Sequence, residues 1–180
     1  MNLVLIGYRG TGKSAVAAHL GRATGRRVIS TDAEIEARLG QSIADYVAEA
    51  GWPAFRDVET EVVRWAAAQD GLVIDTGGGA PEREENVAAL RENGVVIWLT
   101  ASEQTIARRI RNAANRPSLT GQASFLDEIG AVLARRNPLY AAAADYSVAT
   151  GARTPAEVAR AVLEIAGEAL PPSGLPNDVR

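Results

Sequence analysis

The sequence predicts an α/β fold in three layers, with a parallel β-sheet between two layers of helices. Short apolar runs alternate along the chain with longer helical patterns, which is typical of parallel strands joined by crossover helices. The first apolar run leads directly into the sequence GYRGTGKS at residues 7–14, and a helical pattern follows it. This is the setting of a phosphate-binding loop of the G-x-x-x-x-G-K-S type. We therefore expect a doubly wound P-loop protein that binds ligands at the carboxyl ends of its strands.

The expected elements follow one another in the order that this fold requires. Each strand is a short and mostly apolar run, and each helix carries a helical pattern of apolar residues. The strands are expected at residues 3–6, 28–30, 72–75, 95–99 and 146–149. The helices are expected at residues 13–24, 32–39, 43–50, 53–68, 82–93, 103–112, 123–143 and 154–170.

Composition sets limits on the class of protein. A chain of 180 residues fits one domain with a sizeable core, which we place at residues 1–170. Residues 171–180 are rich in proline, lack periodicity and are expected to be disordered. The chain has no cysteine, which excludes disulfides and thiol catalysis, and His19 is its only histidine, which excludes a multi-histidine metal site.

Charge and hydropathy limit the expected partners. The net charge of -3 gives no general basic surface for nucleic acid, and no apolar run approaches the length of a membrane span. A strand begins almost at the first residue, so no signal peptide is expected. We expect a cytoplasmic monomer that acts on a small molecule, without a nucleic-acid or membrane partner.

The phosphate-binding loop predicts binding of a nucleoside triphosphate. Its glycines let the backbone wrap around a phosphate chain, while the helix that follows directs its positive N-terminal end at the anion. The lysine would reach the β- and γ-phosphates, and the serine hydroxyl would bind the bridging Mg²⁺. The loop alone leaves open a kinase, a GTPase switch or an ATPase. The expected nucleotide contacts in the loop are Gly10, Thr11, Gly12, Lys13 and Ser14.

Polar residues follow the second and third strands, where a ligand is expected. Asp32 could orient and deprotonate an acceptor hydroxyl, although Ser30 or Thr31 could simply cap the next helix. Three glycines at residues 77–79 favour close approach of the backbone to a ligand. Asp75, at the end of a buried strand, needs a partner, which a hydrated Mg²⁺ would supply.

Arginines gather at positions expected to face an anionic ligand. One of them, Arg56, lies three residues before Glu59, so the two side chains can pair on one helix face. A segment at residues 112–122, polar and punctuated by proline and glycine, is expected to form a mobile lid. The arginines favour a clamp for carboxylate and phosphate, and they are Arg56, Arg108, Arg109, Arg111, Arg116, Arg135 and Arg136.

Six motifs in this order resemble the shikimate kinase family, over about residues 2–168. The phosphate-binding loop and the acid after the second strand come first. They are followed by FRDVE at 55–59, TGGG at 76–79, Arg-Pro at 116–117 and RNPLY at 136–140. The resemblance implies a nucleoside-monophosphate-kinase-like fold with strand order 2-3-1-4-5. It also implies transfer of the ATP γ-phosphoryl group to the 3-hydroxyl of shikimate, a step in aromatic amino-acid (chorismate) biosynthesis.

The resemblance also implies a role for individual residues on the acceptor side. Asp32 matches the acid that holds the shikimate hydroxyls and orients or deprotonates the acceptor. Arg56 and Arg136 match the pair that clamps the shikimate carboxylate. The backbone of Gly78 and Gly79 matches the glycines that contact substrate.

On the nucleotide side, the resemblance implies two further arginine contacts. Arg116 matches the lid arginine that meets the transferring phosphate, and Arg109 matches the residue that packs on adenine. Lys13, Asp32 and Arg116 are therefore the expected catalytic residues, with ATP as the phosphoryl donor and Mg²⁺ as the cofactor. Ser14 is the expected direct ligand of the metal.

The chain departs from the family pattern at three positions. Ser30 replaces the first acid of the usual Asp-x-Asp, which normally holds water around Mg²⁺. We hypothesise that Asp75, at the end of the next strand, takes over this role through water and that Asp32 contributes in the same way. Val47 replaces an aromatic that commonly packs near shikimate, which would loosen the pocket. Ser118 replaces a common leucine in the lid, which should have a small effect.

Two other readings compete with a shikimate kinase. Another P-loop small-molecule kinase, such as a gluconate kinase, would also use two arginines for a carboxylate, although residues 77–79 and 136–140 favour shikimate. A non-catalytic nucleotide-binding regulator or GTPase switch is the second. The chain lacks an Asn-Lys-x-Asp guanine signature, and it keeps Lys13, Asp32 and Arg116, which a degenerate kinase would be expected to lose.

Overall fold

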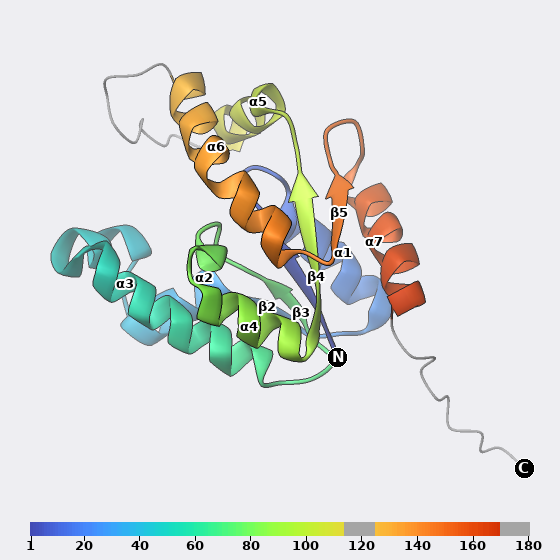
Figure 1. Cartoon of the computed structure of the whole chain (residues 1–180), viewed down its shortest axis with the longest axis horizontal. Helices are drawn as coiled ribbons and strands as arrows, with labels where there is room; N and C mark the ends of the chain where they lie inside the picture. The colour runs from blue at the N-terminus through green and yellow to red at the C-terminus, as the bar shows by residue number, and fades with distance from the viewer. Residues whose placement is uncertain (114–124, 170–180) are drawn as a thin grey trace, which may run out of the picture.

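The structure is a computed structural model that describes residues 1–113 and 125–169. Its centre is a five-stranded parallel sheet with strand order β2-β3-β1-β4-β5 (Figure 1). The fold class and the strand order expected from the sequence are confirmed. The strands are β1 (Asn2–Ile6), β2 (Val28–Ser30), β3 (Val73–Asp75), β4 (Gly94–Thr100) and β5 (Tyr146–Ala149).

Helices connect these strands as crossovers, as a parallel sheet requires. A short 3₁₀ helix, η1 (Ala80–Glu82), follows β3. The described α-helices are α1 (Lys13–Thr24), α2 (Thr31–Leu39), α3 (Ile43–Ala67), α4 (Glu84–Glu92), α5 (Glu103–Ala113), α6 (Phe125–Ala143) and α7 (Pro155–Ala169).

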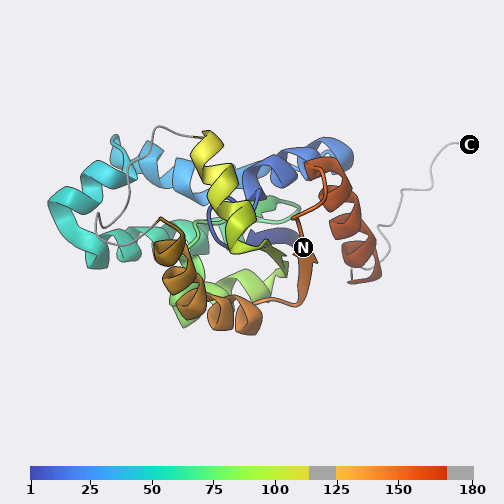
Figure 2. The same ribbon diagram turned by 90° about the horizontal axis from the view of Figure 1, so that it is seen from above.

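The core lies on both faces of the sheet. Along β1, Leu3 and Leu5 pack with apolar side chains of α1 and α7 on one face. Val4 and Ile6 pack on the other face with apolar side chains of α3, α4, α5 and α6. This alternation follows from the two-residue period of a strand and explains why all of β1 is buried and apolar apart from Asn2. Figure 2 shows the sheet between these two helical layers.

The two helices expected at residues 43–50 and 53–68 run on as α3 with a break between them. Gly51 has φ 83° and ψ 167°, which is not helical and which a residue with a side chain rarely adopts. Pro53 follows in the first turn after the break, where its missing N–H is tolerated. The sequence-based division into two helical parts is therefore physically correct.

The predicted start of the helix at residues 82–93 is wrong. The chain first makes the turn of η1, in which the N–H of Glu82 donates to the carbonyl of Gly79 at 2.9 Å. Arg83 is then extended, with φ -113° and ψ 123°, and α4 begins at Glu84. The guanidinium of Arg83 donates a hydrogen bond to Asp57 of α3 at 2.6 Å. This contact favours the extended backbone of Arg83 over a helical turn.

Several expectations fall on the parts of the chain that the structure leaves out. Most of the expected lid, residues 114–122, lies outside the described residues, and so do Arg116 and the expected tail at 171–180. Residues 112–113 belong to the end of α5. Among the helices of the described residues, none is long and apolar enough to cross a membrane.

Candidate active site

A cavity of about 340 Å³ opens at the carboxyl ends of the central strands. It is the place at which a doubly wound sheet binds its ligands. The phosphate-binding loop forms one side, and the ends of β2 and β3 form the other. The lining residues are Arg9, Gly10, Gly12, Lys13, Ser14, Ala15, Ser30, Asp32, Asp75, Thr76, Gly78 and Arg109.

The phosphate-binding loop depends on glycine at defined positions. Gly7 has φ 137°, and a Cβ atom there would lie 2.6 Å from the carbonyl oxygen of Leu99. Gly12 is the N-cap of α1 and has the left-handed conformation, with φ 97°. No side chain makes a capping hydrogen bond to the start of this helix. The first N–H groups of α1 are therefore left for an anion, as expected of a loop that holds phosphates.

Lys13 lies on the floor of the cavity. Its Nζ donates to the carbonyl oxygen of Gly7 at 2.8 Å and contacts that of Tyr8 at 3.4 Å. Burial lowers the pKa of Lys13, while the nearby Asp75 and Asp32 carboxylates oppose that shift. The ammonium group is thus held at the loop by two carbonyls, at the position from which a P-loop lysine reaches phosphate oxygens.

Asp75 and Ser14 lie close together in the same cavity. Asp75 is only 5% exposed, and burial raises its pKa, while the hydrogen bond with the Ser14 side chain and the charge of Lys13 oppose that shift. Asp75 is also the register partner of Ser30 across the β2–β3 ladder. The acid that the sequence places on β3 therefore lies directly beside the position that lacks one on β2.

Ser30 itself serves as a helix cap. Its Oγ accepts a hydrogen bond from the N–H of Ala33 at 3.3 Å at the start of α2, which confirms the capping interpretation for this residue. Thr31 has another task, because its Oγ1 accepts a hydrogen bond from the N–H of Gly77 at 2.8 Å. This bond ties the start of α2 to the glycine run after β3.

Asp32 projects from the first turn of α2 over that glycine run. A Cβ atom on Gly77 would lie 2.6 Å from Oδ1 of Asp32 and 2.8 Å from Oε1 of Glu59, so only glycine leaves room for both carboxylates. Burial raises the pKa of Asp32, against the opposing effect of Lys13. A carboxylate with a raised pKa is a stronger base, which suits a group that takes up a proton from a hydroxyl.

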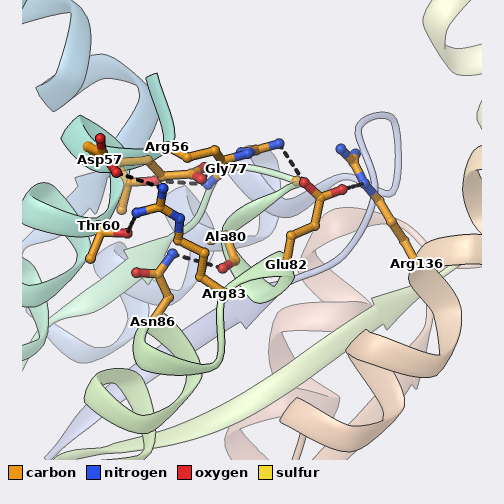
Figure 3. A network of polar contacts seen from close by, with 12 residues as sticks. Arg56, Asp57, Thr60, Gly77, Ala80, Glu82, Arg83, Asn86 and Arg136 are labelled. Carbon is orange, nitrogen blue, oxygen red and sulfur yellow. Dashed lines mark hydrogen bonds and ion pairs between the residues drawn. The ribbon is translucent and has the colours of Figure 1, made fainter. Parts of the chain in front are cut away.

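Arg56 and Arg136 are brought together from α3 and α6, as the sequence predicts (Figure 3). Arg56 Nη1 pairs with Glu59 at 2.5 Å, which confirms the expected pair on one helix face. Arg56 Nη2 and Arg136 Nε both donate to Glu82, each at 2.8 Å. Two guanidinium groups that meet at one point form a site suited to a carboxylate.

Gly79 lies under the Arg56 guanidinium. A Cβ atom there would lie 2.6 Å from Cζ of Arg56, so the close approach requires glycine. At Gly78, the neighbouring glycine, a Cβ atom would lie 3.8 Å from Nη1 of Arg136 and 3.6 Å from the backbone nitrogen of Arg9. Gly78 therefore lies between the phosphate-binding loop and the arginine pair. Contact of Gly78 and Gly79 with a ligand stays a prediction.

Arg109 contacts the outer side of the phosphate-binding loop. Its Nη1 donates to the carbonyl oxygens of Gly10 and Thr11 at 3.3 and 3.2 Å, and its Nη2 donates to the carbonyl of Thr150 at 2.7 Å. The side chain thus lies where the loop meets the end of β5. Contact of Arg109 with adenine stays a prediction.

Two residues of the site were given no role in the sequence analysis, although Tyr140 is the last residue of the RNPLY motif. The hydroxyl of Tyr140 donates to the carbonyl of Gly78 at 2.5 Å, and burial raises the pKa of Tyr140 to about 12. Its signal was its place four residues after Arg136 on the same helix. Glu82 joins Arg56 and Arg136, and its position depends on the turn of η1, which the sequence analysis did not predict. The only hint in the sequence is that an acidic residue follows soon after the glycine run.

The chain is similar throughout to known shikimate kinases. A family model described as shikimate kinase matches residues 9–166. The shikimate kinase of Symbiobacterium thermophilum is 43% identical over 166 residues, covering 91% of this chain and 95% of that protein. The solved structure of shikimate kinase from Acinetobacter baumannii in complex with shikimate matches with a TM-score of 0.87 and 30% identity, covering 93% of each chain.

A gluconokinase shares the fold at lower similarity. The structure of gluconokinase from Sinorhizobium meliloti matches with a TM-score of 0.57 and 18% identity, covering 93% of this chain and 92% of that one. At this level of identity, the likeness concerns the fold alone. The family model and the closer relatives lead to one conclusion: the chain belongs to the shikimate kinase family.

Proposed function

We propose that this protein transfers the γ-phosphoryl group of ATP to the 3-hydroxyl of shikimate, giving shikimate 3-phosphate and ADP. The observation that carries the proposal is the arrangement of three groups around one glycine run. Asp32 lies over Gly77, the phosphate-binding loop lies against Gly78, and the Arg56 guanidinium lies on Gly79. A substrate that carries both a carboxylate and a hydroxyl could therefore place its hydroxyl between Asp32 and the phosphoryl donor while its carboxylate binds the Arg56 side of the clamp. A family member solved with shikimate supports the choice of acid.

On the acceptor side, Asp32 would hold the hydroxyl and take its proton as the new P–O bond forms. Its position over the glycine run fixes its direction, and its raised pKa makes it a better proton acceptor. Phosphoryl transfer passes through a loose transition state, so positioning of the hydroxyl in line with the γ-phosphate contributes more than strong base catalysis.

On the donor side, Lys13 and the N–H groups of the loop would hold the phosphates. Gly10, Thr11, Gly12 and Ser14 complete the loop contacts in this proposal. Lys13 would exchange its present bonds to backbone carbonyls for bonds to phosphate oxygens. The family resemblance assigns Arg116 to the transferring phosphate and Arg109 to adenine.

The oxygen groups near the loop fit Mg²⁺. Ser14 would bind the ion directly, and Asp75 and Asp32 would accept hydrogen bonds from its water ligands. Ser14 is near enough to Asp75 to affect its pKa, and all three side chains line one cavity. Within the described residues, no group of three or more His, Cys, Asp and Glu side chains could hold a metal by itself. Mg²⁺ usually relies on one or two protein oxygens, water and phosphates. It would neutralise charge on the phosphate oxygens.

The wider setting of the proposal follows from the family. The reaction would serve aromatic amino-acid (chorismate) biosynthesis, in the cytoplasm, with the protein acting as a monomer on a small-molecule substrate. The net charge of -3 supports the absence of a nucleic-acid partner. Size-exclusion chromatography with light scattering measures the oligomeric state directly.

An ADP-release assay tests the proposed activity against its two alternatives. ATP and Mg²⁺ are supplied with shikimate, with gluconate or with no acceptor. ADP release that depends on shikimate is the expected result. Release that depends on gluconate alone would make the protein a different small-molecule kinase. A protein that binds ATP and releases no ADP with either acid would be a nucleotide-binding regulator.

The arginines are expected to fall into two kinetic classes. Arg56→Ala and Arg136→Ala each remove charge-assisted bonds made in both the ground state and the transition state, so each should raise KM for shikimate by about tenfold. Arg116→Ala should chiefly lower kcat, because it removes a cation that meets charge developing during transfer. Steady-state kinetics with shikimate as the varied substrate separates the two classes. A change in KM alone for Arg116→Ala would contradict its assignment to the transferring phosphate.

Gly79→Ala is expected to raise KM for shikimate by about tenfold, because the new methyl group occupies the place of the Arg56 guanidinium. The backbone at Gly79 is helical, with φ -103°, so the effect comes from the side chain and not from backbone strain. Gly167→Ala is the matched control, since a Cβ atom there meets nothing within 4 Å. Equal KM values for the two variants would show that Arg56 does not need its observed position.

A further inference from the structure

Glu82 is the only carboxylate in the described residues that bridges the two arginines of the proposed clamp. Its Oε2 accepts from Arg56 Nη2 and its Oε1 accepts from Arg136 Nε, each at 2.8 Å. Figure 3 shows its carboxylate between the two guanidinium groups, with a dashed line to each. One carboxylate shared by two arginines is the contact that the clamp is proposed to make with the substrate.

The charges of the clamp are already balanced without a ligand. Arg56 and Arg136 contribute two positive charges, and Glu59 and Glu82 contribute two negative charges in direct contact with them. Arg135 adds a longer contact to Glu82 at 3.4 Å, but its side chain is 68% exposed and its charge is largely screened. A third carboxylate that entered this cluster would be in excess, and like charges at short range repel one another.

Each arginine of the clamp has a buried neighbour besides Glu82. Glu59, whose side chain is 1% exposed, pairs with Arg56 from within the protein, and the Arg56 guanidinium also rests on Gly79. Arg136 lies close to Tyr140 on its own helix, and the Tyr140 hydroxyl is itself held by the carbonyl of Gly78 at 2.5 Å. Glu59 and Tyr140 are both buried, so these two neighbours would stay beside the clamp if the Glu82 contacts were lost.

Glu82 is also placed to move. It is the last residue of the short 3₁₀ helix η1, its neighbour Arg83 is extended, and its side chain is 25% exposed. Burial alone would raise the pKa of Glu82, but the bond and charge of Arg136 and the charge of Arg56 bring it below its usual value. The carboxylate therefore stays ionised at neutral pH, and a change of rotamer would carry it into solvent.

We propose that Glu82 competes with the substrate carboxylate for Arg56 and Arg136. It occupies the clamp in the free protein and releases at least one of the two arginines when a carboxylate substrate binds. The inference rests on the proposed function, since it takes shikimate as the substrate. Its consequence is specificity by exchange: a carboxylate ligand binds the clamp only if its own carboxylate replaces the bonds that Glu82 gives up. Neutral ligands make no such exchange, and they leave Glu82 where it is.

The test compares Glu82→Gln with the unchanged protein by titration calorimetry against two ligands. The ligands are shikimate and its methyl ester, which is neutral and keeps the ring hydroxyls. Glutamine keeps the size of the side chain and removes its charge. Shikimate is expected to bind Glu82→Gln about tenfold more tightly, the scale of one charge-assisted hydrogen bond. The affinity for the ester should stay within about twofold, so the ratio of the two affinities carries the result.

Glu85→Gln is the matched control. It makes the same change three residues further along, at a 44% exposed side chain that pairs with Arg64 and Arg83 instead of the clamp. The ratio of acid to ester affinity should be unchanged in this variant. Weaker or equal binding of shikimate by Glu82→Gln would overturn the proposal and make Glu82 a support of the clamp.

A second measurement needs no variant and covers the case in which Glu82→Gln fails to fold. Crystal structures of the unchanged protein with and without shikimate should show Glu82 in contact with Arg56 and Arg136 only when shikimate is absent. Glu82 still bonded to both arginines beside bound shikimate would overturn the inference and leave the proposed function intact. Failure of the unchanged protein to bind or phosphorylate shikimate would instead overturn the proposed function, and this inference with it.

Discussion

Lys13→Ala is expected to lower kcat for shikimate phosphorylation by at least about two to three orders of magnitude. This is the scale expected when charge in the transition state loses a preorganised partner. The Lys13 ammonium is buried at the phosphate-binding loop, where it donates hydrogen bonds to the carbonyls of Gly7 and Tyr8. The measurement is the steady-state rate of ADP release at saturating ATP and shikimate.

Arg22→Ala provides the control for Lys13→Ala. It removes one positive charge from the exposed end of the same helix, α1, and should leave kcat within about twofold. Lys13 is also the only lysine of the chain, so an amine-selective reagent can modify no side chain but this one. ATP should protect against inactivation by such a reagent. Full activity of Lys13→Ala would contradict the role of the loop in catalysis.

Asp75→Ala is expected to raise the Mg²⁺ concentration needed for half-maximal activity by about tenfold to a hundredfold. Losses of this size are typical when a side chain that orients a metal's ligands is removed. Asp75 lies beside Ser14, the proposed direct ligand, and it is the register partner of Ser30, where the family usually has an acid. Binding of Mn²⁺ in the presence of ADP, followed by electron paramagnetic resonance, checks the same effect without turnover.

A double variant tests the hypothesis that Asp75 on β3 takes over the role of the acid missing at Ser30 on β2; we call this the exchange hypothesis. Adding Ser30→Asp to Asp75→Ala should restore much of the metal affinity, because the register places the new carboxylate beside the lost one. Ser30→Asp can still cap α2, since aspartate is as good an N-cap as serine. An unchanged dependence on Mg²⁺ in Asp75→Ala would leave the exchange hypothesis without support.

Much of the fold could be predicted because its signals are local. The phosphate-binding loop fixes the junction of the first strand and helix, and the alternation of strands and helices fixes a parallel sheet. The break in α3 was readable because Gly51 and Pro53 are strong local signals. The start of α4 could not be predicted in this way, because it depends on the contact of Arg83 with Asp57, which lies 26 residues earlier in the chain.

The site divides in the same way. Asp75 ends β3 and Asp32 comes two residues after β2, so the rule on strand ends predicts both, while Lys13 follows from the phosphate-binding loop motif. The pairing of Arg56 with Glu59 followed from helix geometry. The bridge made by Glu82 could not be predicted, because it joins α3, η1 and α6 and each contact spans at least 26 residues. Such contacts exist only after the helices have packed against the sheet.

The measurement that tests the central claim most directly is identification of the product. The protein is incubated with ATP, Mg²⁺ and shikimate, and the products are examined by mass spectrometry and by correlated ³¹P and ¹H NMR. The account predicts one phosphorylated acid for each ADP formed, with the phosphorus coupled to the proton on carbon 3 of shikimate. Phosphate on another hydroxyl, or ADP formed without any phosphorylated shikimate, would contradict it.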